Sequence, residues 1–302
     1  MNGILIIDKP AGITSHDVVS RVRRILQTKR VGHTGTLDPF ATGVMVILVG
    51  QATRLAQFLD KDHKEYEALI SFGFSTDTGD KTGIPDTEDP KPKPVKIADM
   101  TSVLSHFRGE IEQTPPMYSA KKIDGRKLYE LARKGETVER KPVTVTISQL
   151  EILPPRPATY DERIDERMTH GIQVVCSAGT YIRTLAEDIG QKLGIGSHLS
   201  ELRRTAAGKF SIGQSITLDQ LAELDDPKAA LIPMTDAVSH LGKFTVAEDR
   251  IDKTRNGLST RVFETGFADG EPVQMLDASG ELIAIGFFDA AENVLQPKVV
   301  LV

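Results

Sequence analysis

The chain has very few residues of the kinds that build disulfides, thiolate metal sites or membrane anchors. Its 302 residues include a single cysteine, Cys176, which excludes an intramolecular disulfide and a metal site of several thiolates. The neighbouring Ile172, Val174 and Val175 indicate that this thiol lies in a buried strand. No apolar run is long enough to span a bilayer, and the first apolar segment, 4–7, is too short for a signal peptide. We therefore expect a cytoplasmic protein.

The sequence also lacks the motifs of several common enzyme classes. No glycine loop is followed by Gly-Lys-Ser or Gly-Lys-Thr, and there is no Gly-x-Gly-x-x-Gly, so neither a P-loop nor a dinucleotide-binding loop is predicted. The seven histidines are scattered and form no pair at helical spacing, which argues against a metal site. The glycine-rich segment described below does not resemble the elbow that presents a serine nucleophile. A lone carboxylate is the chemistry that remains.

An excess of positive charge is missing as well, since the formal net charge is -5. Phosphate binding is driven by Lys and Arg, so this total argues mildly against a nucleic-acid partner. The cations are clustered, however, while acidic residues gather elsewhere, at 86–89 and 161–166. A segregated surface can present one basic face, so composition leaves RNA binding open. The basic clusters are Arg21, Arg23, Arg24, Lys29 and Arg30; Lys121, Lys122, Arg126 and Lys127; and Arg203, Arg204 and Lys209.

The length and the order of the apolar patterns predict one large domain followed by a small one. After Pro233 the runs 273–276, 282–288 and 299–302 indicate hairpin strands around a turn at 277–280, which is typical of a small all-β unit. With a boundary near Gly242, the domains are residues 1–242 and 243–302. Residues 75–94 form a long loop rich in glycine and proline. The segment of about 75–140 is interpreted as an insertion laid over the core.

Alternating and helical periodicities assign the elements of the large domain. Strands are expected at 4–7, 44–49, 66–72, 143–153 and 172–176, with another beginning near 199–204. Helices are expected at 15–26, where Thr14 and Ser15 provide the cap, and at 51–59, 97–107, 126–134 and 180–193. The glycine-rich segment 31–43 is expected to be a loop. Helices and strands mix from the start, which favours an α+β fold with a mixed sheet and flanking helices.

The glycine-rich segment supplies the candidate carboxylate, Asp38, and two interpretations of it are open. Asp38 is followed by Pro39, which suits a helix N-cap with proline at the first helical position, and local physics favours this interpretation. In the other interpretation, the glycines let the backbone approach a ligand closely while Asp38 projects into a cleft. The segment reads Gly32-His33-Thr34-Gly35-Thr36-Leu37-Asp38-Pro39-Phe40-Ala41-Thr42-Gly43.

Several ordered blocks, taken together, resemble the TruB family of tRNA pseudouridine synthases, and the resemblance covers about the first 210 residues. Many blocks in one order are far more specific than one loop, so they favour the catalytic interpretation of Asp38. Besides the glycine-rich segment, the blocks are Asp8-Lys9-Pro10-Ala11-Gly12-Ile13-Thr14-Ser15, Lys64-Glu65-Tyr66, Thr76-Asp77-Thr78-Gly79-Asp80, Pro115-Pro116-Met117-Tyr118-Ser119-Ala120, Gly125-Arg126 with Tyr129, Gly179-Thr180-Tyr181-Ile182-Arg183-Thr184 and Leu202-Arg203-Arg204.

The resemblance implies a pseudouridine synthase core followed by a small PUA-like barrel, with Asp38 as the nucleophile. The reaction breaks the bond from N1 to C1′ of uridine, turns the uracil and joins C5 to C1′, so it needs no cofactor and no metal. A carboxylate with a reference pKa of about 3.9 is ionised at neutral pH and can stabilise positive character at C1′, attack that carbon or the uracil ring, or take a sugar proton. These three options stay open.

Other residues receive roles from the same resemblance. Tyr66 is expected to stack on the target uracil, and Arg183 to pair with Asp38 and keep it ionised. Lys9, His33, Asp80, Tyr181 and Leu202 are expected around the loop and the flipped nucleotides as substrate-binding residues. The insertion is expected to form a thumb over the T-arm. The candidates for contacts with the RNA backbone are Lys121, Lys122, Arg126, Arg203 and Arg204.

The implied target is uridine 55 in the T-loop of tRNA, whose base must leave the stacked loop before Asp38 can reach the sugar. The thumb-like insertion favours action on tRNA without a guide RNA or an obligatory protein partner, by a monomer. A tRNA-folding chaperone that grips the elbow and a uracil glycosidase remain as alternatives. Two departures from the family pattern are Ala178, where a basic residue is expected before Gly179, and the weak likeness of the acidic C-terminal unit to a PUA barrel.

Overall fold

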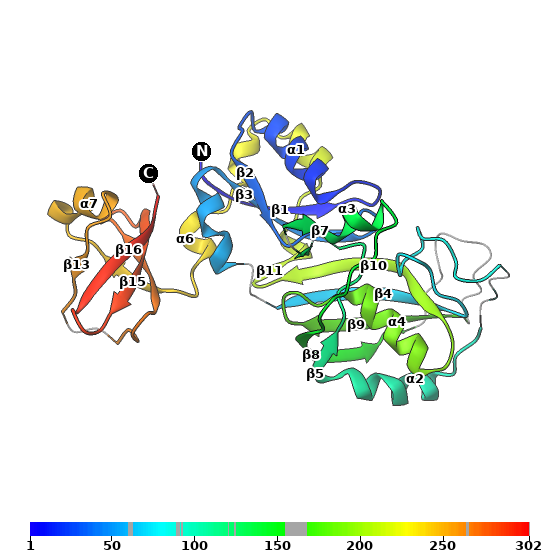
Figure 1. Cartoon of the computed structure of the whole chain (residues 1–302). Helices are drawn as coiled ribbons and strands as arrows, with labels where there is room; N and C mark the ends of the chain where they lie inside the picture. The colour runs from blue at the N-terminus through cyan, green and yellow to red at the C-terminus, as the bar shows by residue number, and fades with distance from the viewer. Residues whose placement is uncertain are drawn as a thin grey trace.

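A computed structural model describes residues 1–59, 63–88, 91, 93–119, 121–123, 125–154, 168–263 and 266–301. The predicted acidic cluster at 161–166 lies outside these residues. Among the described residues, no helix combines the length and the apolar character that crossing a bilayer requires. The body of the molecule is built on one large sheet, and a smaller sheet follows at the C-terminal end (Figure 1).

The large sheet has nine strands within the described residues and is mixed, as predicted. β3 and β10 run parallel, whereas the neighbouring pairs on either side are antiparallel. The strand order is β1 (Gly3–Lys9), β3 (Thr42–Val49), β10 (Ser197–Ala207), β4 (Lys64–Phe72), β9 (Thr169–Cys176), β8 (Val143–Ile152) and β5 (Gly109–Gln113), with β2 (Val31–Thr34) paired to β3 and β11 (Phe210–Ser211) paired to β10.

The near-continuous apolar runs of β1 and β3 exist because both faces of this part of the sheet are covered. Leu5 and Ile7 of β1 point into one hydrophobic core, whereas Ile4 and Ile6 point into a second core on the opposite face. Helices α1 (Ser15–Ile25), α2 (Ile97–Leu104), α4 (Ile182–Lys192) and α5 (Leu218–Glu223) contribute to the first core. The 3-10 helix η1 (Gly50–Phe58) and helix α6 (Met234–Ala237) contribute to the second.

Helix α1 begins where its sequence predicts. The hydroxyl of Thr14 accepts a hydrogen bond from the backbone N–H of Asp17 at 3.1 Å, and the Asp17 carboxylate accepts one from the Thr14 N–H at 2.9 Å. This capping box satisfies two backbone donors at the start of the helix. The hydrogen bonds from Thr14 lower the pKa of the Asp17 carboxyl below its ordinary value. The entry into α1 is thereby fixed next to the glycine-rich segment.

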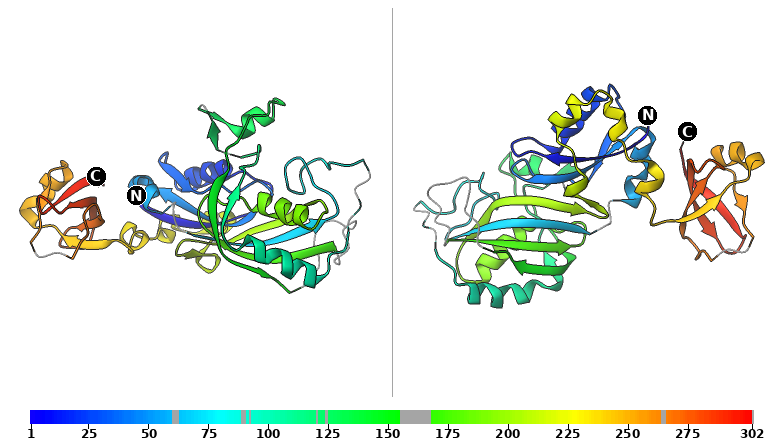
Figure 2. Two further views of the ribbon diagram at one scale, coloured as in Figure 1. Left: turned by 60° about the horizontal axis from the view of Figure 1, so that its bottom comes forward. Right: turned by 180° about the vertical axis from the view of Figure 1, so that it is seen from behind.

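Three local predictions were wrong. Residues 31–34 form strand β2 instead of loop, because they pair with β3. The helix expected at 126–134 is divided into β7 (Arg126–Lys127), which pairs with β6 (Lys122–Ile123), and the short α3 (Leu128–Ala132). Within the expected insertion, α2 and β5 belong to the core, since β5 is the edge strand of the large sheet. The part that stands away from the body contains β6, β7 and α3 (Figure 2), and we call its described residues, 114–119, 121–123 and 125–141, the thumb.

The C-terminal unit is a curled sheet with one helix. The small β unit predicted at this end is confirmed, and helix α7 (Glu248–Arg255) is an addition that was not predicted, because its sequence has almost no apolar face. The unit packs on the body through the rings of Phe58 and Phe287, whose centroids are 6.3 Å apart, and the Arg54 guanidinium donates to the Val300 carbonyl. Its strand order is β12 (Gly242–Thr245), β14 (Pro272–Leu276), β15 (Leu282–Asp289), β16 (Val294–Val300) and β13 (Thr260–Arg261).

Short 3-10 helices complete the chain. They are η2 (Ser105–Phe107), η4 (Ile212–Gln214) and η5 (Pro227–Ala230).

Candidate active site

Asp38 lies in the connection between β2 and β3, and no helix follows it. The N-cap interpretation is therefore wrong: after Asp38 the chain passes through Pro39 and enters β3 at Thr42. The preceding residue, Leu37, is buried and is bonded twice to the Ser15 hydroxyl, which accepts from the Leu37 N–H at 2.9 Å and donates to its carbonyl at 2.9 Å. These two bonds fasten the connection to the first residue of α1.

The other side of Asp38 is held by Lys9, which is fully buried. Its ammonium donates to the carbonyls of Ala41 at 2.7 Å, Pro10 at 3.0 Å and Pro39 at 3.2 Å. Burial lowers the pKa of Lys9 to about 8, while the charge of Asp38 acts in the opposite direction. The three carbonyls satisfy all three donors of an ammonium. Lys9 therefore lies beneath the loop and shapes it.

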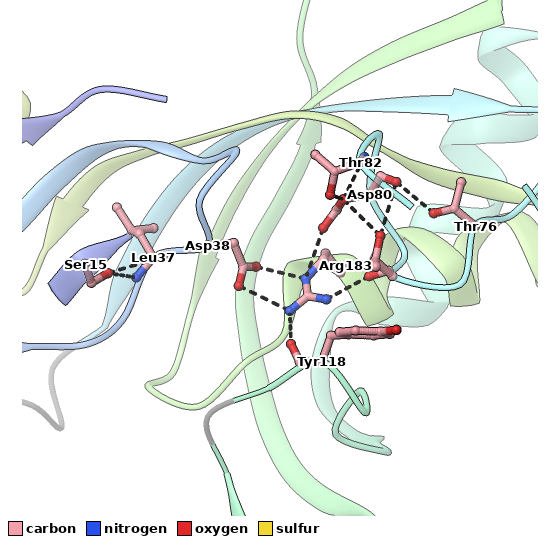
Figure 3. Close-up of polar contacts among 9 residues, drawn as sticks. Ser15, Leu37, Asp38, Thr76, Asp80, Thr82, Tyr118 and Arg183 are labelled. Atoms are coloured by element: carbon pink, nitrogen blue, oxygen red, sulfur yellow. Dashed lines mark hydrogen bonds and ion pairs between the residues drawn. The ribbon is translucent and has the colours of Figure 1, made fainter. Parts of the chain in front are cut away.

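Arg183, in the first turn of α4, forms a bidentate ion pair with Asp38 (Figure 3). Its Nε donates to Oδ2 at 2.9 Å and its Nη2 donates to Oδ1 at 3.3 Å. The same guanidinium donates to the carbonyl of Thr78 at 2.7 Å and to that of Tyr118 at 2.7 Å. A planar fork with several fixed partners orients a carboxylate more strictly than a single contact does. Arg183 thus joins Asp38 to the 76–82 loop and, through Tyr118, to the start of the thumb, which we call its root.

Asp80 lies behind Arg183 and orders the 76–82 loop. Its carboxylate accepts from the Thr82 hydroxyl at 2.5 Å, the Thr82 N–H at 2.9 Å and the Thr78 hydroxyl at 3.0 Å. Asp80 Oδ2 is 4.0 Å from the Nε of Arg183. The guanidinium is therefore placed between two carboxylates, of which only Asp38 faces the cavity described next.

Asp38 stands on the wall of a cavity of about 320 Å³, the size of a small-ligand site. Its side chain keeps 31% of its surface exposed, while that of Arg183 keeps 5%. Burial raises the pKa of the Asp38 carboxyl above its ordinary value, and the positive charge of Arg183 opposes that rise. The described residues that line the cavity are Gly35, Thr36, Leu37, Asp38, Lys64, Tyr66, Ser119, Lys121, Ala178, Gly179, Thr180, Tyr181, Ile182, Arg183, Leu202 and Arg204.

Two family descriptions match consecutive parts of the sequence. The description of the TruB family pseudouridylate synthase N-terminal domain matches residues 23–182, and that of the tRNA pseudouridylate synthase B C-terminal domain matches residues 183–239. The chain belongs to the TruB family. The family resemblance predicted from the ordered sequence blocks is therefore confirmed.

Individual members of the TruB family align along the whole chain. It is 40% identical to tRNA pseudouridine synthase B of Bacillus velezensis over 308 residues, which covers 100% of this chain and 98% of the relative. The enzyme of the same name from Bacillus subtilis is 40% identical over 309 residues, with the same coverage. A chain in the crystal structure of a Cbf5-Nop10-Gar1 complex superimposes with a TM-score of 0.73 at 28% identity, covering 99% of this chain and 85% of that chain. The TruB family chain described here is a tRNA pseudouridine synthase, which is an isomerase.

The structure of this TruB family member brings most of the predicted site residues to one place. Tyr66, Tyr181 and Leu202 line the cavity together with Asp38 and Arg183, although they come from β4, the N-cap of α4 and β10. Burial raises the pKa of the Tyr66 hydroxyl, and the charge of Arg204 opposes the rise. Burial likewise raises the pKa of Tyr181. Two neutral phenol rings therefore face the space in front of the carboxylate.

Other predicted residues lie elsewhere. His33 is on β2 opposite Ile47 of β3 and is absent from the described cavity lining. Lys122 is exposed on the thumb, as is Arg126, whose guanidinium is 3.3 Å from the Glu136 carboxylate. Only Lys121 of the predicted thumb cations reaches the described cavity wall.

The contacts of Arg203 and Arg204 with the RNA backbone stay predictions, and both side chains have partners within the protein. Arg204 is 1% exposed and donates to the carbonyls of Val44 at 2.7 Å and Gly35 at 3.1 Å, so its charge lies beneath the Asp38 loop. Arg203 is bonded to the Asp8 carboxylate at 2.7 Å, which lies on β1 on the far side of β3. Both arginines hold strands and loops together, and Arg204 reaches the cavity from inside the protein.

Lys64 was not predicted as a cavity residue. It lines the cavity and is 5% exposed. Lys64 and Tyr66 are two residues apart on β4 and therefore point to the same face of the strand. The block Lys64-Glu65-Tyr66 allowed this prediction. Because Tyr66 was assigned to the site, Lys64, on the same face of the strand, could have been assigned to it as well. Ser15 was also missed, since its partner Leu37 is 22 positions away.

Replacing Ser15 by alanine is expected to loosen the Asp38 loop. The change leaves the buried N–H and carbonyl of Leu37 without this partner, which costs about 1–3 kcal/mol of stability. A small displacement of Asp38 should lower kcat by about 10-fold. Urea unfolding and single-turnover kinetics measure the two effects. Ser105→Ala, which removes an exposed hydroxyl bonded to the Ser102 carbonyl, is the control; equal kinetics for the two variants would contradict this role of Ser15.

Proposed function

We propose that this enzyme converts uridine 55 in the T-loop of tRNA to pseudouridine, with Asp38 as the nucleophile. The observation that carries the proposal is the bidentate pairing of Asp38 with Arg183 at the wall of the cavity. A cavity of about 320 Å³ suits a single unstacked nucleotide and is far too small for a paired stem. The target base must therefore be flipped out of the T-loop to enter it.

The reaction conserves atoms and electrons without an external reactant. The Asp38 carboxylate bonds to C1′ as the bond from N1 to C1′ breaks with its electron pair on the uracil. The uracil turns and C5 bonds to C1′, which releases the carboxylate with its electron pair; the proton on C5 is then lost and N1 gains one. Tyr66 is proposed to stack on the uracil, with its hydroxyl near the C5 proton. Tyr181 and Leu202 are proposed to enclose the flipped nucleotide.

The positioning of Asp38 supports this assignment. Ser15 and Lys9 fix the loop on its two sides, Arg183 fixes the carboxylate, and Asp80 fixes the loop that binds Arg183. Preorganised groups of this kind lower the barrier because little reorganisation is needed when charge develops. The pKa of the Asp38 carboxyl is higher than that of an ordinary carboxyl. Activity should therefore fall as pH decreases through that raised pKa.

Action without a guide RNA is part of the proposal, and the thumb supports it. A protein that binds the T-arm by itself needs its own cationic surface, and the thumb offers Lys122 and Arg126 as exposed cations beyond the cavity. The test is to incubate the purified chain alone with a tRNA transcript that carries tritium on C5 of its uridines, and with the same transcript having cytidine at position 55. Release of tritium only from the first transcript is expected. No release without added proteins would contradict the proposal.

Reversing charge on the thumb is expected to weaken tRNA binding more than chemistry. Each phosphate contact contributes through counterion release, so Lys122→Glu combined with Arg126→Glu should raise Kd by about 10-fold or more and reduce the salt dependence of Kd. Filter binding at several salt concentrations measures both. Lys96→Glu combined with Lys192→Glu makes the same change in net charge at exposed residues of the α2 and α4 regions. An unchanged Kd for the thumb variant would show that the thumb cations are merely solvated.

The two alternative activities make different predictions. A tRNA-folding chaperone retains its activity when Asp38 is changed, because gripping the elbow does not need the carboxylate. A uracil glycosidase releases free uracil, whereas the proposed isomerase leaves the base attached to the RNA. Chromatography of the small-molecule fraction after reaction detects free uracil and so distinguishes the glycosidase from the isomerase.

A further inference from the structure

Gln113 is a buried glutamine at the point where strand β5 ends and the thumb begins. It is 1% exposed, and its side-chain amide is bonded twice to the backbone of Tyr181. The Nε2 donates to the Tyr181 carbonyl at 3.2 Å, and Oε1 accepts from the Tyr181 N–H at 3.0 Å. The two segments are 68 positions apart in sequence. The glutamine therefore acts as a two-point clamp between the root of the thumb and another part of the chain.

The clamped residue is placed where its orientation matters. Tyr181 lines the cavity and is also the N-cap of α4, the helix whose second residue is Arg183. In the described part of the chain, the Tyr181 side chain makes no capping hydrogen bond to the backbone of this helix. The first turn of a helix has several backbone donors without partners inside the helix, so its orientation depends on outside contacts. Gln113 supplies such a contact at the residue that precedes the turn.

The thumb returns to the same turn of α4 five residues later. The carbonyl of Tyr118 accepts a hydrogen bond from Nη2 of Arg183 at 2.7 Å, and that same Nη2 donates to Asp38 at 3.3 Å. Between the two contacts lie Pro115 and Pro116, whose rings fix their φ angles and stiffen the connection. Gln113 and Tyr118 thus bind the root of the thumb to the helix turn that orients the catalytic carboxylate.

We propose that Gln113 is a positioning residue for the reaction at the Asp38 cavity, because it fixes Tyr181 and the first turn of α4 and so keeps Arg183 aligned on Asp38. This inference rests on the proposed function of Asp38. The thumb, which is proposed above to contact the T-arm, is anchored on the turn that holds the carboxylate.

The clamp requires a donor and an acceptor on one side chain, and substitutions can separate the two. Gln113→Met keeps a similar volume but removes both bonds. Gln113→Glu keeps an oxygen for the Tyr181 N–H but, when ionised, places a second oxygen against the Tyr181 carbonyl. A protonated glutamic acid regains one donor. The effect of Gln113→Glu should therefore diminish as pH decreases.

The matched control is Gln274 on β14, in the C-terminal unit. It is also fully buried, and its Nε2 donates to the Leu241 carbonyl at 3.0 Å. Gln274→Met removes a buried glutamine bond of the same kind at a site remote from the cavity. Stability loss is expected in both methionine variants, because each leaves buried backbone groups without a partner. Only the Gln113 variant should change the chemistry.

The experiment measures single-turnover rate against pH and tRNA Kd for the full-length wild type, Gln113→Met, Gln113→Glu and Gln274→Met. For Gln113→Met we expect kcat to fall by about 10- to 100-fold, the scale of a small misplacement of reacting groups, with Kd nearly unchanged. The acid limb of its pH profile should move to higher pH, because a loosened Arg183 holds Asp38 ionised less well. The rate of Gln113→Glu relative to wild type should rise as pH falls, and Gln274→Met should keep the wild-type profile.

Several results would overturn the inference. A folded Gln113→Met with the wild-type rate and acid limb would do so, as would an equal loss of rate in Gln274→Met. If Gln113→Met does not fold, the pH dependence of Gln113→Glu provides the same test, and a rate ratio independent of pH would reject the clamp. Failure of the proposed function is distinguishable, because in that case the wild-type enzyme itself would form no pseudouridine.

Discussion

Asp38→Asn is expected to abolish pseudouridine formation while tRNA binding persists. The amide has nearly the same shape as the carboxylate but carries no charge and is a poor nucleophile, so kcat should fall by at least about 10⁴-fold, the scale of losing a nucleophile. The bonds of Ser15 and Lys9 that shape the Asp38 loop are made to backbone atoms, and Arg183 keeps its bonds to the Thr78 and Tyr118 carbonyls. Kd for tRNA should therefore stay close to that of the wild type. Rapid-quench kinetics and filter binding measure the two quantities.

The same variant should lose less stability at neutral pH than Arg183→Met does. The amide oxygen can still accept a hydrogen bond from Arg183, although the charge pairing is lost. Because the pKa of Asp38 is raised in the folded protein, ionisation of this carboxyl disfavours the folded state as pH rises through the unfolded pKa, and below that pKa the effect is absent. The neutral amide avoids this effect, which offsets part of the loss. A Tm between those of Arg183→Met and the wild type is expected at neutral pH. Asp86→Asn, in the exposed part of the 75–94 loop, is the control; a rate unaffected by Asp38→Asn would refute the assignment.

Arg183→Met is expected to damage both stability and activity. The side chain is 5% exposed and serves Asp38 and the carbonyls of Thr78 and Tyr118. Removing one partner of a buried ion pair costs about 3–5 kcal/mol, and the partly exposed Asp38 can recover some hydration, so the lower end is expected. Misplacement of the carboxylate should reduce kcat by about 100-fold. Urea unfolding and single-turnover kinetics give the two values.

The pH dependence of Arg183→Met tests the reason for its lower rate. The positive charge of Arg183 opposes the rise in the pKa of Asp38, so without it this pKa rises further and less carboxylate is ionised at any given pH. The acid limb should move to higher pH, and activity should recover partly as pH increases. Arg108→Met removes an arginine that donates to the Leu150 carbonyl at 2.8 Å, far from the cavity. An Arg183→Met profile parallel to that of Arg108→Met would contradict the electrostatic role.

Much of the large domain follows from local patterns. The apolar run at 4–7 predicts β1 and the Thr14 cap predicts α1, because the hydrophobic pattern and the capping of a helix depend on nearby residues only. Strand β2 and helix α7 were not predicted, for opposite reasons. Residues 31–34 become a strand through pairing with β3, which is a non-local contact. Helix α7 has Ile251 as the one large apolar side chain between 248 and 255, so its sequence shows almost no apolar periodicity that would predict a helix.

In the candidate site, too, contacts between distant segments decide the structure and could not be predicted from local patterns. Asp38 before Pro39 satisfies the local rule for a helix cap, yet the chain continues into β3, because that strand pairs with β1 from Gly43 to Val49. Lys9 and Arg204 look like surface cations in the sequence, but each is buried against carbonyls of distant segments. Family resemblance places Tyr66 and Arg183 near Asp38, whereas Gln113 emerges only from contacts 68 positions apart. Residues that support a site are thus harder to predict than residues that line it.

The most direct test of the account is to map pseudouridine at every position of one tRNA transcript after treatment with the purified wild type or with Asp38→Asn. We expect a single modified position, uridine 55, with the wild type acting alone, and an unmodified transcript with the variant. Modification by Asp38→Asn, or modification by the wild type at another position with uridine 55 left intact, would contradict it.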